Sequence, residues 1–555
     1  MKTIILDKKS DAKKNKILPN KKSDKTVQKP VKNVSAKKAV SVSNKNKAAA
    51  VQKNAAKTSK PAVQKSVQKP VQKSVQKPEK KFVENITNIL QDFPKWYTDI
   101  VLKTELCDYG PVKGTMVIRP YGFALWENIK NELDKQLKAQ DYQNAYFPML
   151  IPSSFIEREK EHVAGFAPEL ATVTHVGTET LNEKLYIRPT SETIIGNMIA
   201  KWLQSYKELP MKINQWCNVV RWEKTTRPFL RTSEFLWHEA HAVYADAKIA
   251  KTNAYNDLML YEKFMRDYLA IPALVGQKSE KEKFAGAEIT YGVEAMMKDG
   301  KSLQIGTSHY LGQNFSKSFN IKFQDDKKTE RYAYTTSFGT STRLIGAIVM
   351  THGDDRGLVL PPRVAPIQVV VVPIAQQKPG VLNTAKNIQR SLSNLHYRVA
   401  IDDSDNTPGW KFNQWEMKGV PVRIEVGPRD IENNECQVFR RDLLTKETIK
   451  LNRVEGYVAE LLEEIHRTML RNATQIRDKH IKHVKTFPEL KKAINAGNFV
   501  SAPWCDCTEC EEKIKTETNG VSTRVMLFDA EPEKNAVCVK CGKPAKVEII
   551  FAKAY

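Results

Sequence analysis

Charged and aromatic residues gather in the stretch RWEKTTRPFLRTSEFLWHE, which begins at Arg221. Strand-forming residues flank it, so we expect a long antiparallel hairpin closed by a charged loop. Arg221 and Glu223 are two positions apart and share one face. Arg231, Phe235 and Glu239 are each separated by an even number of positions, so they are also expected to share one face. Such a face offers cations to the phosphates of ATP and an aromatic plane to its adenine, although parity alone favours a plain ladder of solvated ion pairs.

A second cation lies far along the chain, in SFGTSTRLIGA. The pattern predicts a strand, a turn and an apolar helix with Arg343 in its first turn. That turn carries the positive end of the helix dipole, so an arginine there is unfavourable. The placement becomes reasonable if an anion binds in front of the helix. We therefore expect Arg343 to face an anionic ligand.

Five of the eight cysteines fall in the segments PWCDCTEC and CVKCGKP near the end of the chain. Cys538 and Cys541 are separated by two residues and followed by glycine, a strong signal for a zinc knuckle. Spacing alone pairs them with Cys507 and Cys510. Four thiolates close the coordination sphere of Zn²⁺, so the predicted role is structural. Free thiols and metal ligands suit a cytoplasmic protein better than disulfides do.

Several periodic segments must position these residues. Apolar residues at helical spacing predict helices over 122–140, 191–209 and 247–269, the second with Ser191 as its N-cap. The apolar run NAYFPMLIP, 144–152, predicts a strand. The β-branched run APIQVVVVPI is typical of a strand covered on both faces and opens a compact α/β region.

These patterns divide the chain into four parts. We expect a tail over 1–81, a catalytic body over 82–364, an α/β domain over 365–466, and a linker helix with a small domain over 467–555. The tail holds 24 lysines and 4 acidic residues, and thus +20 of the net charge of +25. Its Val-Gln-Lys-Ser/Pro repeats predict disorder. A polyanion tether and an incidental solubilising tail explain it about equally well. No apolar run is long enough for a membrane helix or a signal peptide.

Together the segments resemble the three signature motifs of class II aminoacyl-tRNA synthetases. The helix with NAYFPMLIP resembles motif 1, the hairpin resembles motif 2, and Arg343 stands at the arginine of motif 3, with Thr342 in place of the usual glutamate. Longer stretches resemble prolyl-tRNA synthetase of the archaeal/eukaryotic type: LYIRPTSETIIGNMIAKW, KFAGAEITY, LQIGTSHYLGQNF and the terminal FAKAY. This resemblance covers about 82–555. It departs from the family at Phe338, usually tryptophan, and at Ala240, usually glycine.

The resemblance implies an α/β multidomain protein with an antiparallel-sheet catalytic domain, an α/β anticodon-binding domain and a small zinc-binding α+β domain. It implies that ATP, with Mg²⁺, activates L-proline to prolyl-adenylate, and that the prolyl group then passes to tRNA(Pro). A homodimer is also implied. The residues implied for proline are Thr190, Glu192, Arg221, Trp237 and His309. Those implied for ATP are Arg221, Glu223, Thr232, Ser233, Phe235, Gln304, Thr307, Ser341 and Arg343.

Two further sets follow from the same resemblance. Lys411, Glu416, Lys418 and Arg423 are candidates for anticodon contacts. The family's C-x4-C spacing selects Cys505, Cys510, Cys538 and Cys541 as the zinc ligands. A non-catalytic tRNA-binding paralogue and a threonyl-type enzyme are the alternatives; the intact Arg221, Glu192 and Arg343 argue against the first, and PTSET with GTSHYLG against the second.

A pocket for proline cannot strongly reject smaller amino acids, because a missing methylene is worth only about 1–3 kcal/mol. We therefore expect misactivation of alanine and cysteine. Bacterial-type relatives carry a large editing insertion between motifs 2 and 3. Glu239 and Gln304 are 65 positions apart, which leaves no room for one.

Overall fold

The computed structural model describes residues 86–157 and 170–555. The lysine-rich tail lies outside these residues, so its disorder and its role stay predictions. Within the described part, no helix is long and apolar enough to cross a membrane.

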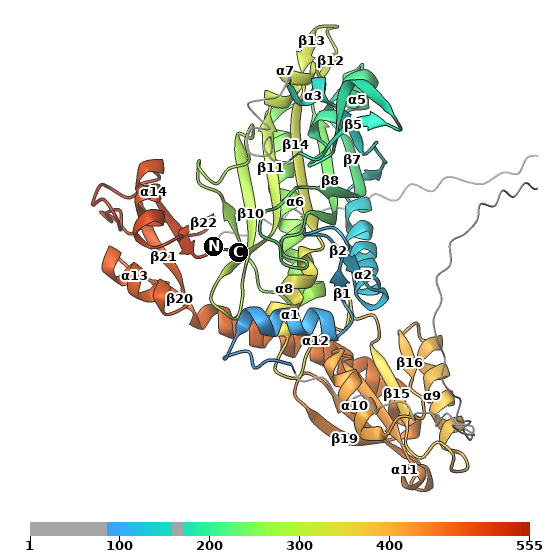
Figure 1. Ribbon diagram of the computed structural model, residues 1–555. Helices are drawn as coiled ribbons and strands as arrows, with labels where there is room; N and C mark the ends of the chain where they lie inside the picture. The colour runs from blue at the N-terminus through green and yellow to red at the C-terminus, as the bar shows by residue number, and fades with distance from the viewer. Residues whose placement is uncertain (1–85, 158–169) are drawn as a thin grey trace, which may run out of the picture. The chain divides into compact units, whose positions relative to one another are not determined.

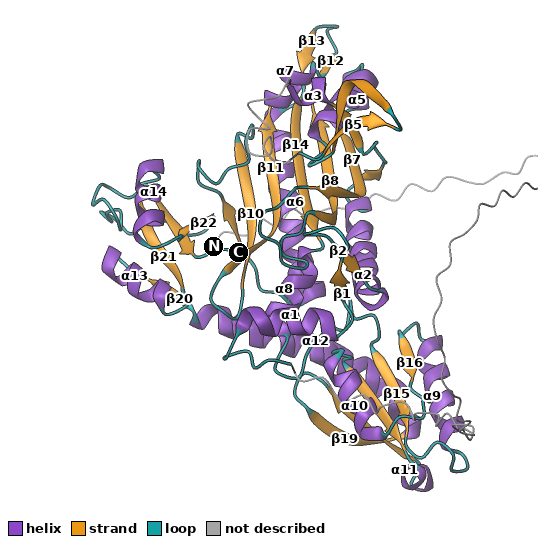
Figure 2. Cartoon of the chain, in the orientation of Figure 1, coloured by secondary structure: helices purple, strands orange, loops and turns teal. Residues whose placement is uncertain are grey.

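An eleven-stranded sheet forms the centre of the fold (Figures 1 and 2). Its neighbours are antiparallel, except for the parallel pairs β3–β7 and β20–β21 at the two edges. In sheet order the strands are β20 (Ile481–His483), β21 (Phe499–Trp504), β23 (Val547–Ala552), β22 (Ser522–Leu527), β9 (Leu274–Gln277), β10 (Ile289–Met296), β11 (Ser302–Gly312), β14 (Tyr334–Ser341), β8 (Glu234–Tyr244), β7 (Met211–Val220) and β3 (Gln143–Asn144).

Helix α6 (Ala247–Leu269) covers one face of this sheet, with the bounds that the sequence predicts. It begins after Asp246, whose side chain caps the amide of Ile249 at 2.9 Å. Its apolar side packs against β10, β11 and β14 and is buried in the main core. Tyr261 of α6 is hydrogen-bonded to His238 of β8, with 2.6 Å between the hydroxyl and Nε2. Every second residue of β8, His238 among them, therefore faces α6. The residues between them point to the opposite face of the sheet.

The predicted hairpin is confirmed. β7 pairs with β8 along the whole length of β7, and Gln215, Cys217 and Val219 lie opposite Glu239, Trp237 and Phe235. β7 ends at Val220, so Arg221 and Glu223 lie just past the strand rather than on it.

Two predicted elements are wrong in extent. The segment 144–152 is not one strand: β3 ends at Asn144 and joins the large sheet, whereas β4 (Leu150–Pro152) joins β5 and β6 in a separate small sheet. Pro148, which has no amide hydrogen to donate, stands in the gap. The second helix, α5 (Glu192–Trp202), ends seven residues before the predicted end at 209. Ser205 and Glu208 form a capping box there and start a separate turn.

The α/β region forms a five-stranded sheet with strand order β16-β15-β17-β18-β19. β15 is parallel to both of its neighbours, and all five of its residues are buried, as the apolar run predicts. Its strands are β15 (Val369–Pro373), β16 (Val399–Ile401), β17 (Val422–Val426), β18 (Glu435–Arg440) and β19 (Thr445–Lys450). Its helices are α9 (Val381–Asn394), α10 (Pro408–Met417) and α11 (Pro428–Glu432).

Helix α12 (Val454–Lys479) contains the predicted boundary at residue 466, so the α/β region and the C-terminal region share one helix. The C-terminal strands continue the large sheet, because β22 pairs with β9 at Met526–Gln277 and Leu527–Gly276. The remaining elements are α1 (Phe93–Lys103), α2 (Pro120–Lys138), α3 (Ser153–Glu157), α7 (Asn314–Phe319), α8 (Arg343–His352), α13 (Phe487–Asn495), α14 (Thr508–Glu517), β1 (Cys107–Tyr109), β2 (Met116–Ile118), β5 (Thr172–Val176), β6 (Glu179–Ile187), β12 (Lys322–Gln324) and β13 (Glu330–Tyr332).

Candidate active site

A cavity of about 260 Å³ lies on the sheet face that α6 leaves open. Four alternate residues of β8 line it, namely Phe235, Trp237, Glu239 and His241, as strand parity predicts. The remaining lining residues are Thr190, Glu192, Arg221, Glu282, Phe284, Thr290, Gln304, Ile305, Gly306, Thr307, His309, Ser337, Phe338, Gly339, Thr340, Ser341 and Arg343.

Arg221 enters the cavity from the end of β7. Its Nε donates to the carbonyl of Pro189 at 3.0 Å, and its guanidinium lies 5.6 and 5.4 Å from the ring centroids of Phe235 and Trp237. Burial lowers the pKa of Arg221, while the nearby carboxylates of Glu192 and Glu239 oppose that shift. The result is a cation that lies beside two aromatic rings and lines the cavity.

Arg343 is the first residue of α8, as the sequence predicts. Its side chain donates to the carbonyls of Leu230 at 3.1 Å and Gln304 at 3.0 Å. Burial, together with the charges of Arg221 and Arg231, lowers its pKa to about 10. Arg343 is therefore still a cation at neutral pH, and the repulsion would be relieved by a bound anion.

A smaller cavity, of about 50 Å³, shares Arg221, Phe235, Ser341 and Arg343 with the first. Glu223, Arg231 and Thr232 also line it. Arg231 lies before β8 and its side chain is 52% exposed, so it does not belong to the row of β8 residues that the parity argument placed it in.

Ser233 lines neither of these cavities. Its side chain is buried beside Gly114, where a Cβ would come within 2.4 Å of the Ser233 hydroxyl. Its amide donates to Gly114 and its carbonyl accepts from Arg221. The structure therefore gives Ser233 a supporting position behind the cavity and does not favour a direct side-chain contact with a nucleotide.

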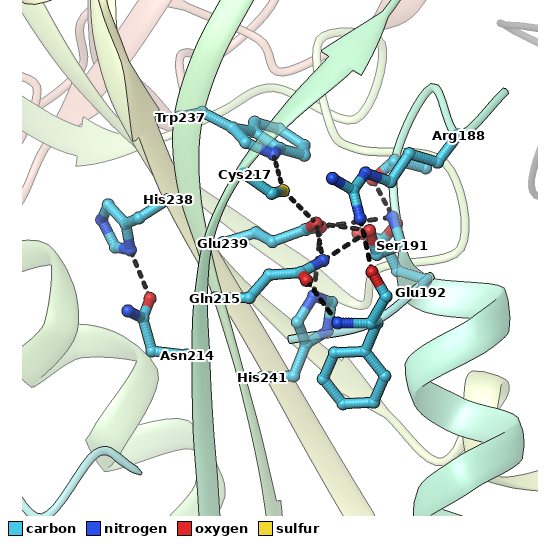
Figure 3. Close-up of polar contacts among 12 residues, drawn as sticks. Arg188, Ser191, Glu192, Asn214, Gln215, Cys217, Trp237, His238, Glu239 and His241 are labelled. Carbon is cyan, nitrogen blue, oxygen red and sulfur yellow. Dashed lines mark hydrogen bonds and ion pairs between the residues drawn. The ribbon is translucent and has the colours of Figure 1, made fainter. Parts of the chain in front are cut away.

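Glu239, which lines the cavity, is the centre of a buried network (Figure 3). Its carboxylate accepts from the amide and hydroxyl of Ser191 and from Gln215 Nε2 at 2.7 Å. His241 Nε2 lies 3.5 Å from it. Burial alone would raise the pKa of Glu239, but these partners outweigh burial and lower it. Burial alone would lower the pKa of His241, but Glu239 and Glu192 raise it.

This network corrects the predicted role of Ser191. It stands at the N-cap of α5 as expected, yet its hydroxyl makes no capping bond and donates to Glu239 instead. The neighbouring Thr190 hydroxyl donates to Glu192.

His309 and Phe284 form an aromatic wall with ring centroids 4.6 Å apart. Thr290 Oγ1 lies 3.0 Å from Nδ1 of His309. Burial lowers the pKa of His309 to about 3, with further contributions from His241 and Lys278, so the imidazole is neutral. Sequence reasoning missed Phe284 and His241 as lining residues. Strand parity on β8 could have found His241, but no local pattern points to Phe284.

The cysteine cluster matches the set that the family spacing selects. The sulfur atoms of Cys505, Cys510, Cys538 and Cys541 all lie within 4.8 Å of one another, and two pairs are 3.6 Å apart. Zn–S bonds of about 2.3 Å place tetrahedral sulfurs roughly 3.8 Å apart, so these residues fit zinc. Cys507 points elsewhere and donates to Glu509.

The four candidates for anticodon contacts are already engaged within the protein. Lys411 and Arg423 are buried; Arg423 pairs with Glu416 and Glu425, and Lys411 donates to the carbonyl of Asp402. Lys418 pairs with Glu105 of the catalytic body at 2.6 Å. The structure thus places these residues in ion pairs and hydrogen bonds within the protein, and their contact with the anticodon stays a prediction.

Comparison with known proteins agrees with this architecture. Three family models match: the class II tRNA synthetase core domain (G, H, P, S and T) at 175–352, the anticodon binding domain at 368–461, and the prolyl-tRNA synthetase C-terminal domain at 487–555. The proline–tRNA ligases of Alkaliphilus oremlandii and Acetoanaerobium sticklandii are each 54% identical over 476 residues, which cover 85% of this chain and 98% of the relative. That of Clostridium novyi is 54% identical over 475 residues, 85% of this chain and 99% of the relative. A class II core whose cavity is lined by two arginines and several aromatic side chains, together with relatives of this similarity over most of the chain, shows that the chain belongs to the proline–tRNA ligases.

Proposed function

We propose that the cavity activates L-proline with ATP through two cations with separate tasks. Arg221 would hold the α-phosphate, where charge develops as prolyl-adenylate forms, and Arg343 would hold the terminal phosphates. Phe235 would stack on adenine. Mg²⁺ would accompany ATP and neutralise its phosphates. The observation that carries this proposal is that two partly buried arginines and Phe235 line the same two adjoining cavities.

The nucleotide would extend over β11, the end of β14 and the loop between β7 and β8. Gln304, Thr307 and Ser341 line the larger cavity, and Glu223 and Thr232 line the smaller one that adjoins it. These positions support the expected nucleotide contacts.

Proline would bind at the end of the cavity that carries Glu192. The hydroxyl of Thr190 orients this carboxylate, which would accept the ring ammonium of proline. Trp237, His309 and Phe284 would enclose the apolar ring. Alanine and cysteine are small enough to enter such a pocket, so weak misactivation is part of the proposal.

ATP–pyrophosphate exchange tests these roles. The parent protein should exchange strongly with proline and weakly with alanine or cysteine, and Arg221→Ala should reduce proline-dependent exchange by about a hundredfold or more. Arg331→Ala is the matched control, because this exposed arginine of β13 pairs with Asp325 and lines neither cavity. A loss below about tenfold, roughly 1.4 kcal/mol, in Arg221→Ala would refute its role. Absence of exchange in the folded parent would favour a non-catalytic tRNA-binding protein.

We further propose that the four clustered cysteines hold one structural Zn²⁺. Four thiolates leave no open coordination position, so the ion would stabilise the fold of the C-terminal region. All eight cysteines are free, which fits the reducing cytoplasm where we place the protein.

A second copy of the chain is the proposed partner besides tRNA(Pro). Large apolar side chains are exposed in and around the segment that resembles motif 1, and exposed apolar clusters mark interfaces. They are Tyr109, Val117, Phe123, Tyr146, Met149 and Leu150. Sedimentation equilibrium should give a dimer mass, and Tyr146→Glu should shift the equilibrium toward the monomer. A monomer at all concentrations of the parent would contradict this proposal.

A further inference from the structure

The loop between β9 and β10, residues 278–288, forms part of the cavity wall. Phe284 and Glu282 of this loop line the cavity, and Phe284 packs on His309. The amide of Phe284 donates to Thr290 Oγ1 at 3.0 Å, and the same oxygen contacts His309. The aromatic wall therefore depends on where this loop lies.

Buried charges fix the first residue of the loop. Lys278 is ion-paired with Glu294 of β10, with 2.5 Å between Nζ and Oε1, and both side chains are almost fully buried. Arg524 of β22 donates to the same carboxylate at 3.0 Å. Ser302 of β11 donates to its other oxygen. Arg524 also lies 3.8 Å from Glu282, the loop residue that lines the cavity.

A second buried contact fixes the next residue. Ser279 Oγ donates to Glu511 of α14 at 2.9 Å and lies 3.0 Å from the Thr523 hydroxyl of β22. Thr523 donates to the same carboxylate at 2.6 Å. Ser279 Oγ also accepts from the amide of Glu282. Glu511 and Thr523 both come from the C-terminal region, more than 200 positions from the loop.

Two glycines permit this arrangement. A Cβ at Gly276 would come within 2.2 Å of the carbonyl oxygen of Met526, so the close approach of β9 and β22 requires glycine. A Cβ at Gly292 would come within 2.5 Å of Cε of Lys278. The two glycines therefore allow Lys278 and β22 to lie close to the base of the loop.

We propose that Arg524, Thr523 and Glu511 are positioning residues for amino-acid selection. They hold the base of the 278–288 loop and thereby keep Phe284 against His309. The inference rests on the proposed function and adds that the C-terminal region sets the fit of the proline pocket. If the loop moves away, the pocket widens around the ring. Proline loses contacts with the wall, whereas alanine, which is too short to reach it, loses few.

Amino-acid-dependent exchange of the full-length protein tests the proposal. Arg524→Gln removes one cation, and Thr523→Val removes one hydroxyl at nearly constant shape. Each should raise the KM for proline by about tenfold and lower the preference for proline over alanine, because a lost wall contact has that order of effect. The KM for ATP should stay within about twofold, since the nucleotide cavity is held by other residues. Arg524→Lys, which keeps the charge, should restore part of the proline affinity.

Lys281→Gln provides the matched control. Lys281 also pairs with the C-terminal region, at 3.2 Å from Glu512, but this pair is partly exposed and should contribute little to loop position. The proposal is overturned if Thr523→Val, folded to the parental extent by circular dichroism, keeps the parental KM for proline and the parental preference over alanine. It is also overturned if KM for ATP rises as much as KM for proline. If Arg524→Gln fails to fold, the KM values of Thr523→Val are sufficient to test the proposal. Failure of the parent to exchange would instead refute the proposed function.

Discussion

Replacing Glu239 by glutamine tests the reading of the buried network most directly, because it keeps the shape and removes the charge. One carboxylate oxygen accepts from the Ser191 hydroxyl and from Gln215 Nε2. The other accepts from the Ser191 amide, 3.2 Å away, and faces His241 Nε2 at 3.5 Å. An amide has only one acceptor oxygen, so it cannot serve both sets of donors.

Either orientation of the new amide leaves donors facing each other. If its nitrogen replaces the second oxygen, it faces the amide of Ser191, which cannot rotate. If its nitrogen replaces the first oxygen, it faces Gln215 Nε2. Gln215 cannot turn over without losing the bond that its own oxygen accepts from Phe147, at 3.1 Å. A buried donor left without an acceptor costs about 1–3 kcal/mol, and His241 also loses its charged partner, so we expect a loss of ~3 kcal/mol of folding free energy.

Urea unfolding and proline-dependent exchange measure the two consequences. Glu239→Gln should unfold at lower urea and show a KM for proline raised about tenfold, since Glu239 lines the cavity. Glu234→Gln is the matched control on the same strand. Its exposed carboxylate accepts one bond, from Asn218 at 2.7 Å, so the change should stay within about 0.5 kcal/mol. Equal stability and equal KM in Glu239→Gln and the parent protein would contradict a structural role for the Glu239 network.

Three further outcomes follow from the structure. Arg343→Ala should lower exchange by about a hundredfold, with a larger effect on the KM for ATP than for proline; equal effects on both would contradict its place at the phosphates. Cys505→Ser should bind less than one equivalent of zinc by metal analysis, whereas Cys507→Ser should keep it, and the reverse pattern would contradict the ligand set. Burial raises the pKa of Asp257 to about 7 despite the bond from Tyr142. The folded protein thus keeps a proton that the unfolded chain releases above about pH 4, and stability falls as the pH rises from about 4 to about 7, by at most ~4 kcal/mol. Asp257→Asn should flatten the melting temperature between about pH 5 and pH 8, and an unchanged pH profile would contradict this assignment.

The C-terminal region belongs to the same large sheet as the cavity. Strand β22 extends the catalytic sheet, and the last residue, Tyr555, returns to it: its amide donates to the carbonyl of Ser302 and its hydroxyl to Asp299. Such contacts make this region part of the framework around the cavity. Changes there are expected to alter substrate binding as well as stability.

Features that depend on short-range pattern could be predicted from the sequence. Strand parity placed Phe235 and Glu239 on one face, helical periodicity placed 247–269 with the observed bounds, and the turn before Arg343 placed it at the start of α8. Periodicity succeeds here because side-chain direction is set by backbone geometry within a few residues. For the same reason, parity could not extend to Arg231, which lies before the strand begins.

Contacts between residues far apart along the chain depend on how the whole chain folds. Cysteine spacing alone favoured Cys507 as a zinc ligand. In the structure its thiol donates to Glu509 and lies outside the cluster of four sulfurs. No local pattern marks Phe284 as the neighbour of His309, because a loop has no periodicity to read. The pairing of Arg524 with Glu294 joins residues 230 positions apart through a sheet whose strand order is not written in local sequence. These contacts form only when the whole core packs closely together, so no short segment of the sequence predicts any one of them.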